Sequence, residues 1–346
     1  MSLHLRTPLL RSDALGRALG GGANVWLKMD SLQPPGSFKL RGVGNLVRNA
    51  IAGGATHVVS SSGGNAGLAT AYAGRELGVP VTVVLPETTP AFVVGRLREY
   101  GADAVVHGKV WDEANARALE LVEDLGGAGA LVHPFDHPDL WEGHATLVHE
   151  VREQLEAQTG HARAPAAVVT VVGGGGLLRG ILQGLDDVAD VWGNSVPVIA
   201  CETRGAASMA SSLEAGHLVT LPGIDSVAKS LGAATVSKEI FEHCVALGPD
   251  RVQPWVTSDE AAVRACARFA EDHRTLVEPA CGAGLAAVYE HAAEGAGAPL
   301  AGLLGAGAEE GGDNENTANV VVVVCGGAMA TPASLRGWCD DLGIEV

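Results

Sequence analysis

The sequence predicts an α/β fold with two open, mostly parallel β-sheets and flanking helices. Short β-branched runs alternate with alanine- and leucine-rich stretches, which is the pattern of βαβ units. The run from Val320 to Val324 is apolar without alternation, as expected for a strand that is covered on both faces. The 47 glycines and only 4% aromatic residues favour many tight strand-to-helix turns over an aromatic-rich β-sandwich.

The alternation falls into two series. In the first, "THVVSSS", "VTVVLP" and "DAVVHG" each precede a helical stretch. The second follows residue 158 and contains "AAVVTVVGGGG", "VPVIACET" and "NVVVVVCGG". We expect one sheet from each series. The segment 295–318 is rich in glycine, alanine and acidic residues, and we expect it to be mainly a flexible surface loop without chemistry.

Composition limits the possible partners. The 346 residues are enough for two domains, and 40 acidic against 23 basic residues give a net charge of −17. A broad attraction to nucleic acid or to anionic lipid is therefore not expected. No apolar stretch reaches the roughly 20 residues that a membrane helix needs. Six dispersed cysteines without a CxxC pair, and an N-terminus without a signal-peptide core, predict reduced thiols and a cytoplasmic protein.

A run of four glycines follows a buried-type strand in "VVGGGGLLRG", Gly173 to Gly176. Such a run lets several N–H groups point at one anion, next to the positive end of the following helix. Neither a P-loop nor the GxGxxG spacing is present. The alternatives are a phosphate cradle and a simple strand-to-helix turn.

Three further stretches carry residues that could bind a ligand. "SSSGGNAG", from Ser60 to Gly67, offers hydroxyls and amides at a helix start, either for a carboxylate or as a helix N-cap. The alternatives for Lys39 are a solvated surface charge and, with a lowered pKa, an amine that forms a Schiff base with a carbonyl group. Cys325 is an inert buried thiol or a group facing a ligand at a strand end. Together these features would suit a ligand with an aldehyde, a phosphate and a ring, which is pyridoxal phosphate.

Many ordered stretches resemble the serine/threonine dehydratases of the fold-type II pyridoxal-phosphate enzymes, and most closely the short liver-type L-serine dehydratases. These stretches run from "LRTPLLRSDAL" through "WLKMDSLQPPGSFKLRG", "PFDHPDLWEGHA", "ACETRGAAS", "LPGIDSVAKSLG" and "EPACGAG" to "VVVVCGGAM". The resemblance implies a tryptophan synthase β-like fold and a homodimer. It also implies a large cofactor-binding domain, residues 1–33 and 139–346, and a small domain that binds the substrate carboxylate, residues 34–138.

The resemblance assigns the site residues. Lys39 would form the Schiff base and remove the α-proton, Phe38 would pack on the cofactor ring, and Cys325 would face the pyridine nitrogen. The phosphate would be held by Gly173, Gly174, Gly175, Gly176 and Leu177. The substrate carboxylate would be held by Ser62, Gly63, Asn65 and Ala66, with Asn65 also reaching the ring hydroxyl.

The implied reaction is β-elimination of L-serine, and of L-threonine, to pyruvate or 2-oxobutanoate and ammonia. A neutral thiol at Cys325 favours this elimination over racemisation, because an aspartate there would make the ring a stronger electron sink. The liver-type enzyme has alanine where this chain has Gly63, which leaves rate and preference open.

The family also binds a cation, and the corresponding residues here are Glu202, Ala206, Ser208, Leu231 and Ala233. Relatives that prefer a divalent ion tend to have aspartate at the Ser208 position. One carboxylate with a hydroxyl and carbonyls forms an oxygen cage of low charge, which suits potassium. The alternative for Glu202 is a surface acid that caps a loop.

Two other features weigh less. His133 and His137 flank an acid, but two prolines prevent a regular helix that would put both on one face, which disfavours a metal site. Glu278 in "EPACGAG" is expected to support the cofactor pocket without acting as a catalyst.

Three rival functions stay open. A serine racemase or a β-replacement enzyme of the same fold would share Lys39 and the glycine run, and product analysis with L-serine separates them. A nicotinamide-dependent oxidoreductase would need the GxGxxG spacing that is missing. A non-catalytic amino-acid-binding relative would keep the cofactor loop without turnover, and the intact Lys39 weighs against it.

Overall fold

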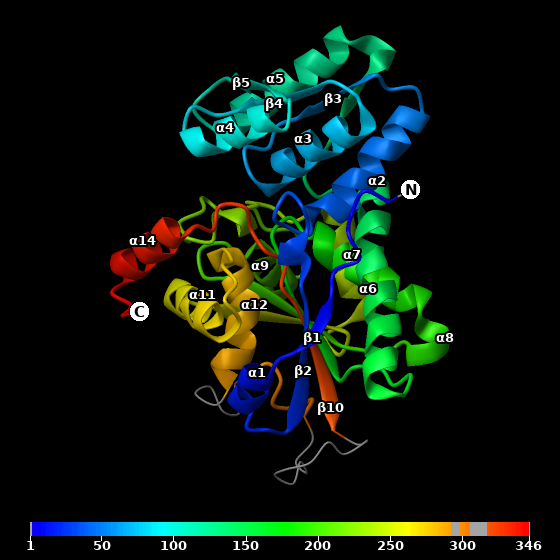
Figure 1. Cartoon of the computed structure of the whole chain (residues 1–346), viewed down its shortest axis with the longest axis vertical. Coiled ribbons are helices and arrows are strands. Elements are labelled where there is room, and N and C mark those ends of the chain that lie inside the picture. The colour runs from blue at the N-terminus through cyan, green and yellow to red at the C-terminus, as the bar shows by residue number, and fades with distance from the viewer. Residues whose placement is uncertain (1, 292–297, 305–316, 346) are drawn as a thin grey trace.

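The computed structural model describes residues 2–291, 298–304 and 317–345, and contains two β-sheets that lie at opposite ends of the molecule (Figure 1). Most of the predicted loop 295–318 lies outside the described residues. Within the described part, no helix combines the length and apolar character that crossing a membrane requires.

The larger sheet has six strands in the order β1-β2-β10-β7-β8-β9, and only β1 runs antiparallel to its neighbour. Its strands are β1 (Leu9–Arg11), β2 (Ala23–Lys28), β7 (Ala167–Val171), β8 (Val198–Thr203), β9 (Val252–Thr257) and β10 (Ala318–Val323). In the parallel β10–β2 pair, Val323 lies opposite Lys28. The chain therefore leaves both strands at the same edge of the sheet, although they are far apart in sequence.

The smaller sheet is entirely parallel, in the order β5-β4-β3-β6. Its strands are β3 (His57–Ser60), β4 (Val81–Leu85), β5 (Asp103–Val106) and β6 (Gly129–Leu131). Parallel strands need crossover connections, and α3, α4 and α5 supply them at the top of the molecule (Figure 1).

The helices complete the layers on both sides of the sheets. Their bounds are α1 (Asp13–Ala18), α2 (Lys39–Ala52), α3 (Asn65–Leu77), α4 (Ala91–Glu99), α5 (Trp111–Asp124), α6 (Pro138–Thr159), α7 (Gly176–Asp187), α8 (Ala189–Trp192), α9 (Ser208–Ala215), α10 (Lys238–Leu247), α11 (Asp259–His273), α12 (Pro279–Tyr289) and α14 (Pro332–Leu342), with 3-10 turns η1 (Asp30–Leu32), η2 (Gly126–Ala128) and η3 (Lys229–Leu231). Every residue of α12 is buried. Its Gly282 allows α11 to approach, because a Cβ there would lie 2.2 Å from the carbonyl oxygen of Ala262.

The predicted pair of mostly parallel sheets is confirmed, and residues Val320 to Val324 are at most 1% exposed. Strands β1, β2, β6 and β9 were not predicted. The domain limits at residues 34 and 138 stay a prediction.

Candidate active site

The turn that precedes Lys39 lies against the loop that follows β10. The amide of Phe38 donates to the carbonyl oxygen of Cys325 at 3.1 Å, and the amide of Gly327 donates to the carbonyl oxygen of Gly36 at 2.9 Å. Because β2 and β10 are neighbours, these two loops leave the sheet side by side. The structure thus brings Lys39 and Cys325 into one region.

Lys39 is the first residue of α2, and its side chain is partly buried. Its Nζ donates to the carbonyl oxygen of Pro134 at 2.7 Å and lies 4.9 Å from the centroid of the Phe38 ring. Burial lowers the pKa of Lys39 to about 8. The amine therefore loses its proton much more readily than a free lysine, although most of it stays protonated at neutral pH. Attack on an aldehyde requires the unprotonated form.

This pKa predicts how cofactor uptake depends on pH. Only the unprotonated amine is a nucleophile, so the rate at which the cofactor-free protein forms its visible absorbance band should rise with pH and level off above pH 8. Stopped-flow absorbance after mixing with pyridoxal phosphate measures this rate. A rate that is constant from about pH 6 to 9 would contradict the assignment of Lys39.

The glycine run joins β7 to α7. Gly175 has φ +95°, a conformation that glycine adopts readily and other residues rarely do. A Cβ on Gly174 would lie 2.2 Å from Cγ of Phe135, and a Cβ on Gly176 would lie 2.5 Å from the Phe135 carbonyl oxygen. Phe135 therefore requires glycine at both positions. The first N–H groups of α7 have no acceptor within the helix, so the run fits an anion such as a phosphate.

The loop between β3 and α3 contains the predicted carboxylate-binding residues. Ser62 Oγ accepts from the amide of Gly64 at 3.3 Å, and Asn65 and Ala66 begin α3. An alanine Cβ at Gly63 would lie 2.8 Å from Oγ1 of Thr89, so the alanine of the liver-type enzyme would require that side chain to turn here.

Gly67, in the first turn of α3, packs against this loop and was not singled out from the sequence. A Cβ at this position would lie 1.8 Å from the Ser62 carbonyl oxygen. We expect Gly67→Ala to push the Ser62 to Ala66 loop out of place and to raise the KM for L-serine at least tenfold, roughly 1.4 kcal/mol of binding. Steady-state kinetics measure this effect. Gly95→Ala is the matched control, because a Cβ on Gly95 would meet nothing within 4 Å.

The side chain of Asn65 is bonded at both ends. Its Oδ1 accepts from the amide of Ala328 at 2.8 Å, and its Nδ2 donates to the carboxylate oxygens of Glu278 at 3.2 and 3.3 Å. Glu278 also accepts from the hydroxyl of Ser230 and from the amide of Met329, the latter at 2.9 Å. The fold thus gives Glu278 a direct contact with a predicted site residue.

Cys325 is buried beside Cys281. A hydrogen bond with Cys281 and burial raise the pKa of Cys325 well above its usual value, so the thiol keeps its proton. All six cysteines of the chain are free and buried.

The predicted cation residues lie around the start of α9 and around η3. The Glu202 carboxylate accepts from the amides of Met209 and Ala210 at 3.0 and 2.7 Å, which places it beside Ser208. The Ser208 Oγ is buried and has no hydrogen-bond partner among the described residues. Ala206 is buried, and Leu231, whose carbonyl oxygen accepts from Ala233 at 2.8 Å, lies against Gly173.

The two histidines of "HPFDHPD" do not share a helix face. Nδ1 of His133 accepts from the amide of Asp136 at 2.8 Å. His137 is the N-cap of α6, and its Nδ1 accepts from the amide of Asp139 at 3.1 Å. No group of three or more His, Cys, Asp or Glu that could hold a metal ion was found in residues 2–291, 298–304 and 317–345.

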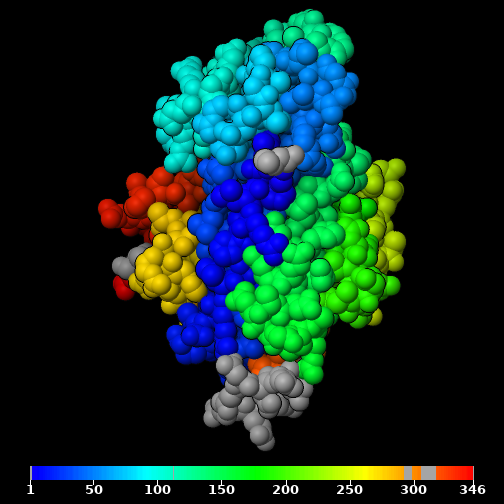
Figure 2. Space-filling model, turned by 45° about the vertical axis from the view of Figure 1, so that its right-hand side comes forward, coloured from blue at the N-terminus to red at the C-terminus, as the bar shows by residue number. Residues whose placement is uncertain are grey.

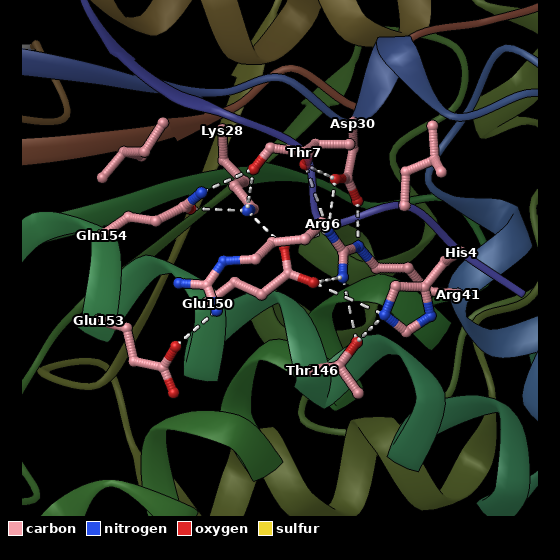
Figure 3. Close-up of polar contacts among 12 residues, drawn as sticks. His4, Arg6, Thr7, Lys28, Asp30, Arg41, Thr146, Glu150, Glu153 and Gln154 are labelled. Atoms are coloured by element: carbon pink, nitrogen blue, oxygen red, sulfur yellow. Dashed lines mark hydrogen bonds and ion pairs between the residues drawn. The ribbon is translucent and has the colours of Figure 1, made fainter. Parts of the chain in front are cut away.

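A buried ionic network, which sequence reasoning missed, holds α2 in place (Figure 3). Arg41 Nε donates to Oδ2 of Asp30 at 2.6 Å, and the Arg41 Nη atoms donate to both oxygens of Glu150 at 2.8 Å. Lys28 Nζ donates to Glu150 at 2.5 Å. The N-terminal segment crosses this region against α6, where Gln154 donates to the carbonyl oxygen of Thr7 at 2.9 Å, and Figure 2 shows it in dark blue beside the green residues. The network thereby fixes the helix that begins with Lys39.

A lysine with a lowered pKa near a glycine run at a helix start is the combination expected in enzymes that hold an aldehyde cofactor through a lysine. The chain belongs to the family of pyridoxal-phosphate dependent enzymes, whose model matches residues 1–326. The fold is that of fold type II, with threonine deaminase and serine ammonia-lyase structures among its neighbours. The resemblance to the serine/threonine dehydratases is thus confirmed.

Several relatives are similar to this chain over nearly its whole length. Serine dehydratase-like of Mus musculus is 48% identical over 98% of this chain and 95% of its own. L-serine dehydratase/L-threonine deaminase of the same species is 44% identical over 99% of this chain and 97% of its own. The crystal structure of a fungal L-serine ammonia-lyase from Rhizomucor miehei has a TM-score of 0.83 and 34% identity, and covers 98% of this chain and 99% of its own.

Proposed function

We propose that this protein catalyses the pyridoxal-phosphate-dependent β-elimination of L-serine, and of L-threonine, to pyruvate or 2-oxobutanoate and ammonia. The observation that carries the proposal is that the turn before Lys39 is hydrogen-bonded to Cys325, from the Phe38 amide to the Cys325 carbonyl oxygen at 3.1 Å. This contact places a lysine whose pKa is lowered to about 8 near a thiol that keeps its proton. Relatives named for serine dehydration and threonine deamination support it.

The residues fit the cofactor. Lys39 would hold its aldehyde, residues 173–177 its phosphate, and Phe38 and Cys325 would lie along its ring. Glycine is required at 174 and 176 because Phe135 packs against both positions, so the fit to the phosphate rests on the backbone N–H groups of the run at the start of α7. When bound, the cofactor supplies a conjugated ring that stabilises negative charge at the substrate Cα.

The chain's own residues then have separate tasks. The amine of Lys39, whose lowered pKa of about 8 makes it easier to deprotonate than a free lysine, would accept the α-proton of the substrate in its unprotonated form. The Ser62, Gly63, Asn65 and Ala66 loop would bind and orient the substrate carboxylate at the start of α3. Cys325 keeps its proton and adds no charge beside the ring nitrogen, which favours rapid loss of the β-hydroxyl over racemisation.

The test is product analysis with purified protein. We expect L-serine to yield pyruvate and ammonia in equal amounts, together with a change in the visible absorbance of the bound cofactor. Chiral chromatography of the remaining serine separates elimination from racemisation. D-Serine formed faster than pyruvate would replace this proposal with the racemase alternative.

We also propose a monovalent cation, potassium, bound by Glu202, Ala206, Ser208, Leu231 and Ala233. The Ser208 hydroxyl, which has no hydrogen-bond partner in the described part of the chain, lies beside a single carboxylate and supports the proposal, because such a set offers oxygen ligands at low charge. Activity should fall severalfold when lithium replaces potassium. Ser208→Asp should add a response to magnesium or calcium, and equal activity in all salts would argue against the site.

The family resemblance further supports a cytoplasmic homodimer. Sedimentation velocity of the purified protein would reveal the assembly, and fractionation of the source cells its location.

A further inference from the structure

Glu278 is a buried carboxylate whose partners come from three separate parts of the chain. Its side chain is 4% exposed and accepts from Asn65 at the start of α3, from Ser230 in η3 and from Met329 after β10. A Cβ on Gly327, which has φ +136°, would lie 2.3 Å from Glu278 Cδ. Glycine at 327 therefore makes room for this carboxylate.

The partners of Asn65 determine which way its amide points. The amide of Ala328 can only donate, so it needs Oδ1 of Asn65, and an ionised Glu278 carboxylate can only accept, so it needs Nδ2. A flipped amide would place oxygen against the carboxylate and NH2 against a backbone N–H. Glu278 and the loop after β10 therefore select one orientation of Asn65.

Glu278 also connects the side-chain amide of Asn65 to the η3 turn, which lies beside the glycine run. Its partner Ser230 is next to Leu231, and a Cβ on Gly173 would lie 3.2 Å from Leu231 Cα and from the Ser230 carbonyl oxygen. The carboxylate thus links the start of α3 in the smaller-sheet layer with η3 beside the glycine run. Burial raises the pKa of Glu278, and the hydrogen bonds from Ser230, Met329 and Asn65 act against that shift.

We infer that Glu278 is a positioning residue that orients Asn65 toward the amino-acid substrate and joins the carboxylate loop to the loop after β10. The inference rests on the proposed function, because it uses Asn65 as a substrate-binding residue.

The kinetic test is a double-mutant cycle of Glu278→Gln and Asn65→Ala. Glutamine has one acceptor oxygen and one donor group, so it cannot accept from Asn65, Ser230 and Met329 together. We expect Glu278→Gln to raise the KM for L-serine about tenfold with a smaller change in kcat. In the Asn65→Ala background the same change should have little further effect on KM. Effects that multiply fully in the double variant would overturn the inference.

A second readout does not depend on turnover. In the cofactor-free protein, the side-chain 15N–1H resonances of Asn65 can be assigned by their loss in Asn65→Ala. They should shift in Glu278→Gln and stay in place in Glu242→Gln, a matched change of an exposed glutamate on α10. Unchanged resonances in Glu278→Gln would contradict the inference even if the activity falls.

Two further variants keep the test informative if Glu278→Gln folds poorly. Ser230→Ala removes a donor to Glu278 and also an Oγ that Asn65 Nδ2 contacts at 3.4 Å, and it should raise KM by about threefold. Glu278→Asp keeps the charge on a shorter side chain, so the Asn65 resonances should lie closer to their original positions than in Glu278→Gln. No effect of either variant on KM or on the Asn65 resonances would overturn the inference. Failure of the proposed function would instead be seen in the unmodified protein, as absence of pyruvate formation, while the Asn65 resonances would still report on Glu278.

Discussion

Replacing Lys39 by alanine is expected to abolish both the visible absorbance of the lysine-bound cofactor and the formation of pyruvate. The variant loses the nucleophile that binds the aldehyde and the base that accepts the α-proton, and a positioned base alone contributes on the order of 10²- to 10⁴-fold. We therefore expect kcat to fall by at least about 10³-fold. Absorbance spectra and a pyruvate assay at saturating L-serine measure the two losses.

Two matched changes identify the cause of the loss. Lys39→Arg keeps the positive charge but cannot lose its proton, so it should be as inactive as the alanine variant. Lys238→Ala removes an exposed lysine on α10, whose side chain is 75% exposed, and should leave both the spectrum and the activity unchanged. A Lys39→Ala protein that retains absorbance and turnover would show that another amine does this chemistry.

Several site residues could be predicted from the sequence because each marks a strand-to-helix turn. The four glycines after β7, the hydroxyls before α3 and the thiol after β10 all follow buried-type strands. Strands β7 and β10 are neighbours in the larger sheet, and the carboxyl ends of neighbouring parallel strands meet at one edge, so the glycine run and the thiol come together there. Strand β3 belongs to the smaller sheet, so the hydroxyl loop could be grouped with them only because all these groups suit one cofactor.

The strands that were not predicted lack a pattern that local reasoning can use. Strand β6 is only Gly129–Leu131, without a β-branched residue. Strand β9 contains Pro254, which cannot donate to a ladder and argues against a central strand. It is tolerated because β9 is the edge strand and has β8 as its neighbour on one side only.

The contacts of Glu278 and Arg41 could not be predicted because they depend on tertiary structure. Charged residues in a sequence are expected on the surface, yet Arg41 is 1% exposed and Asp30 is fully buried. Asp30, Arg41 and Glu150 meet only because η1, α2 and α6 pack together. No local spacing indicates this arrangement.

Replacing Arg41 by leucine is expected to lower the free energy of unfolding by about 3 to 5 kcal/mol, the cost of breaking a buried ion pair by removing one partner. Asp30 would lose its charged partner, and Glu150 would retain Lys28 and the histidine at position 4. Urea-induced unfolding followed by circular dichroism measures the change. Arg41→Lys should be less harmful, because it keeps the charge but loses the paired contacts of the guanidinium.

The same network predicts how stability depends on pH. Burial by itself raises the pKa of Glu150, but hydrogen bonds and charges from Arg41, His4 and Lys28 hold it far below its usual value. A lowered pKa in the folded state stabilises the protein above the unfolded-state pKa, and that contribution is lost as the pH falls. The unmodified protein should therefore lose more stability than Arg41→Leu when the pH is lowered from neutral to below about 4.5.

An exposed ion pair provides the control that separates burial from charge. Arg6 Nη1 lies 2.6 Å from the Glu153 carboxylate, but the two side chains are 54% and 46% exposed. Arg6→Leu should change the free energy of unfolding by less than about 1 kcal/mol, because water already solvates both groups. If Arg6→Leu and Arg41→Leu had equal effects, the buried network would contribute no more than a surface pair. Stabilisation of α2, and with it of Lys39, would then have to come from apolar packing alone.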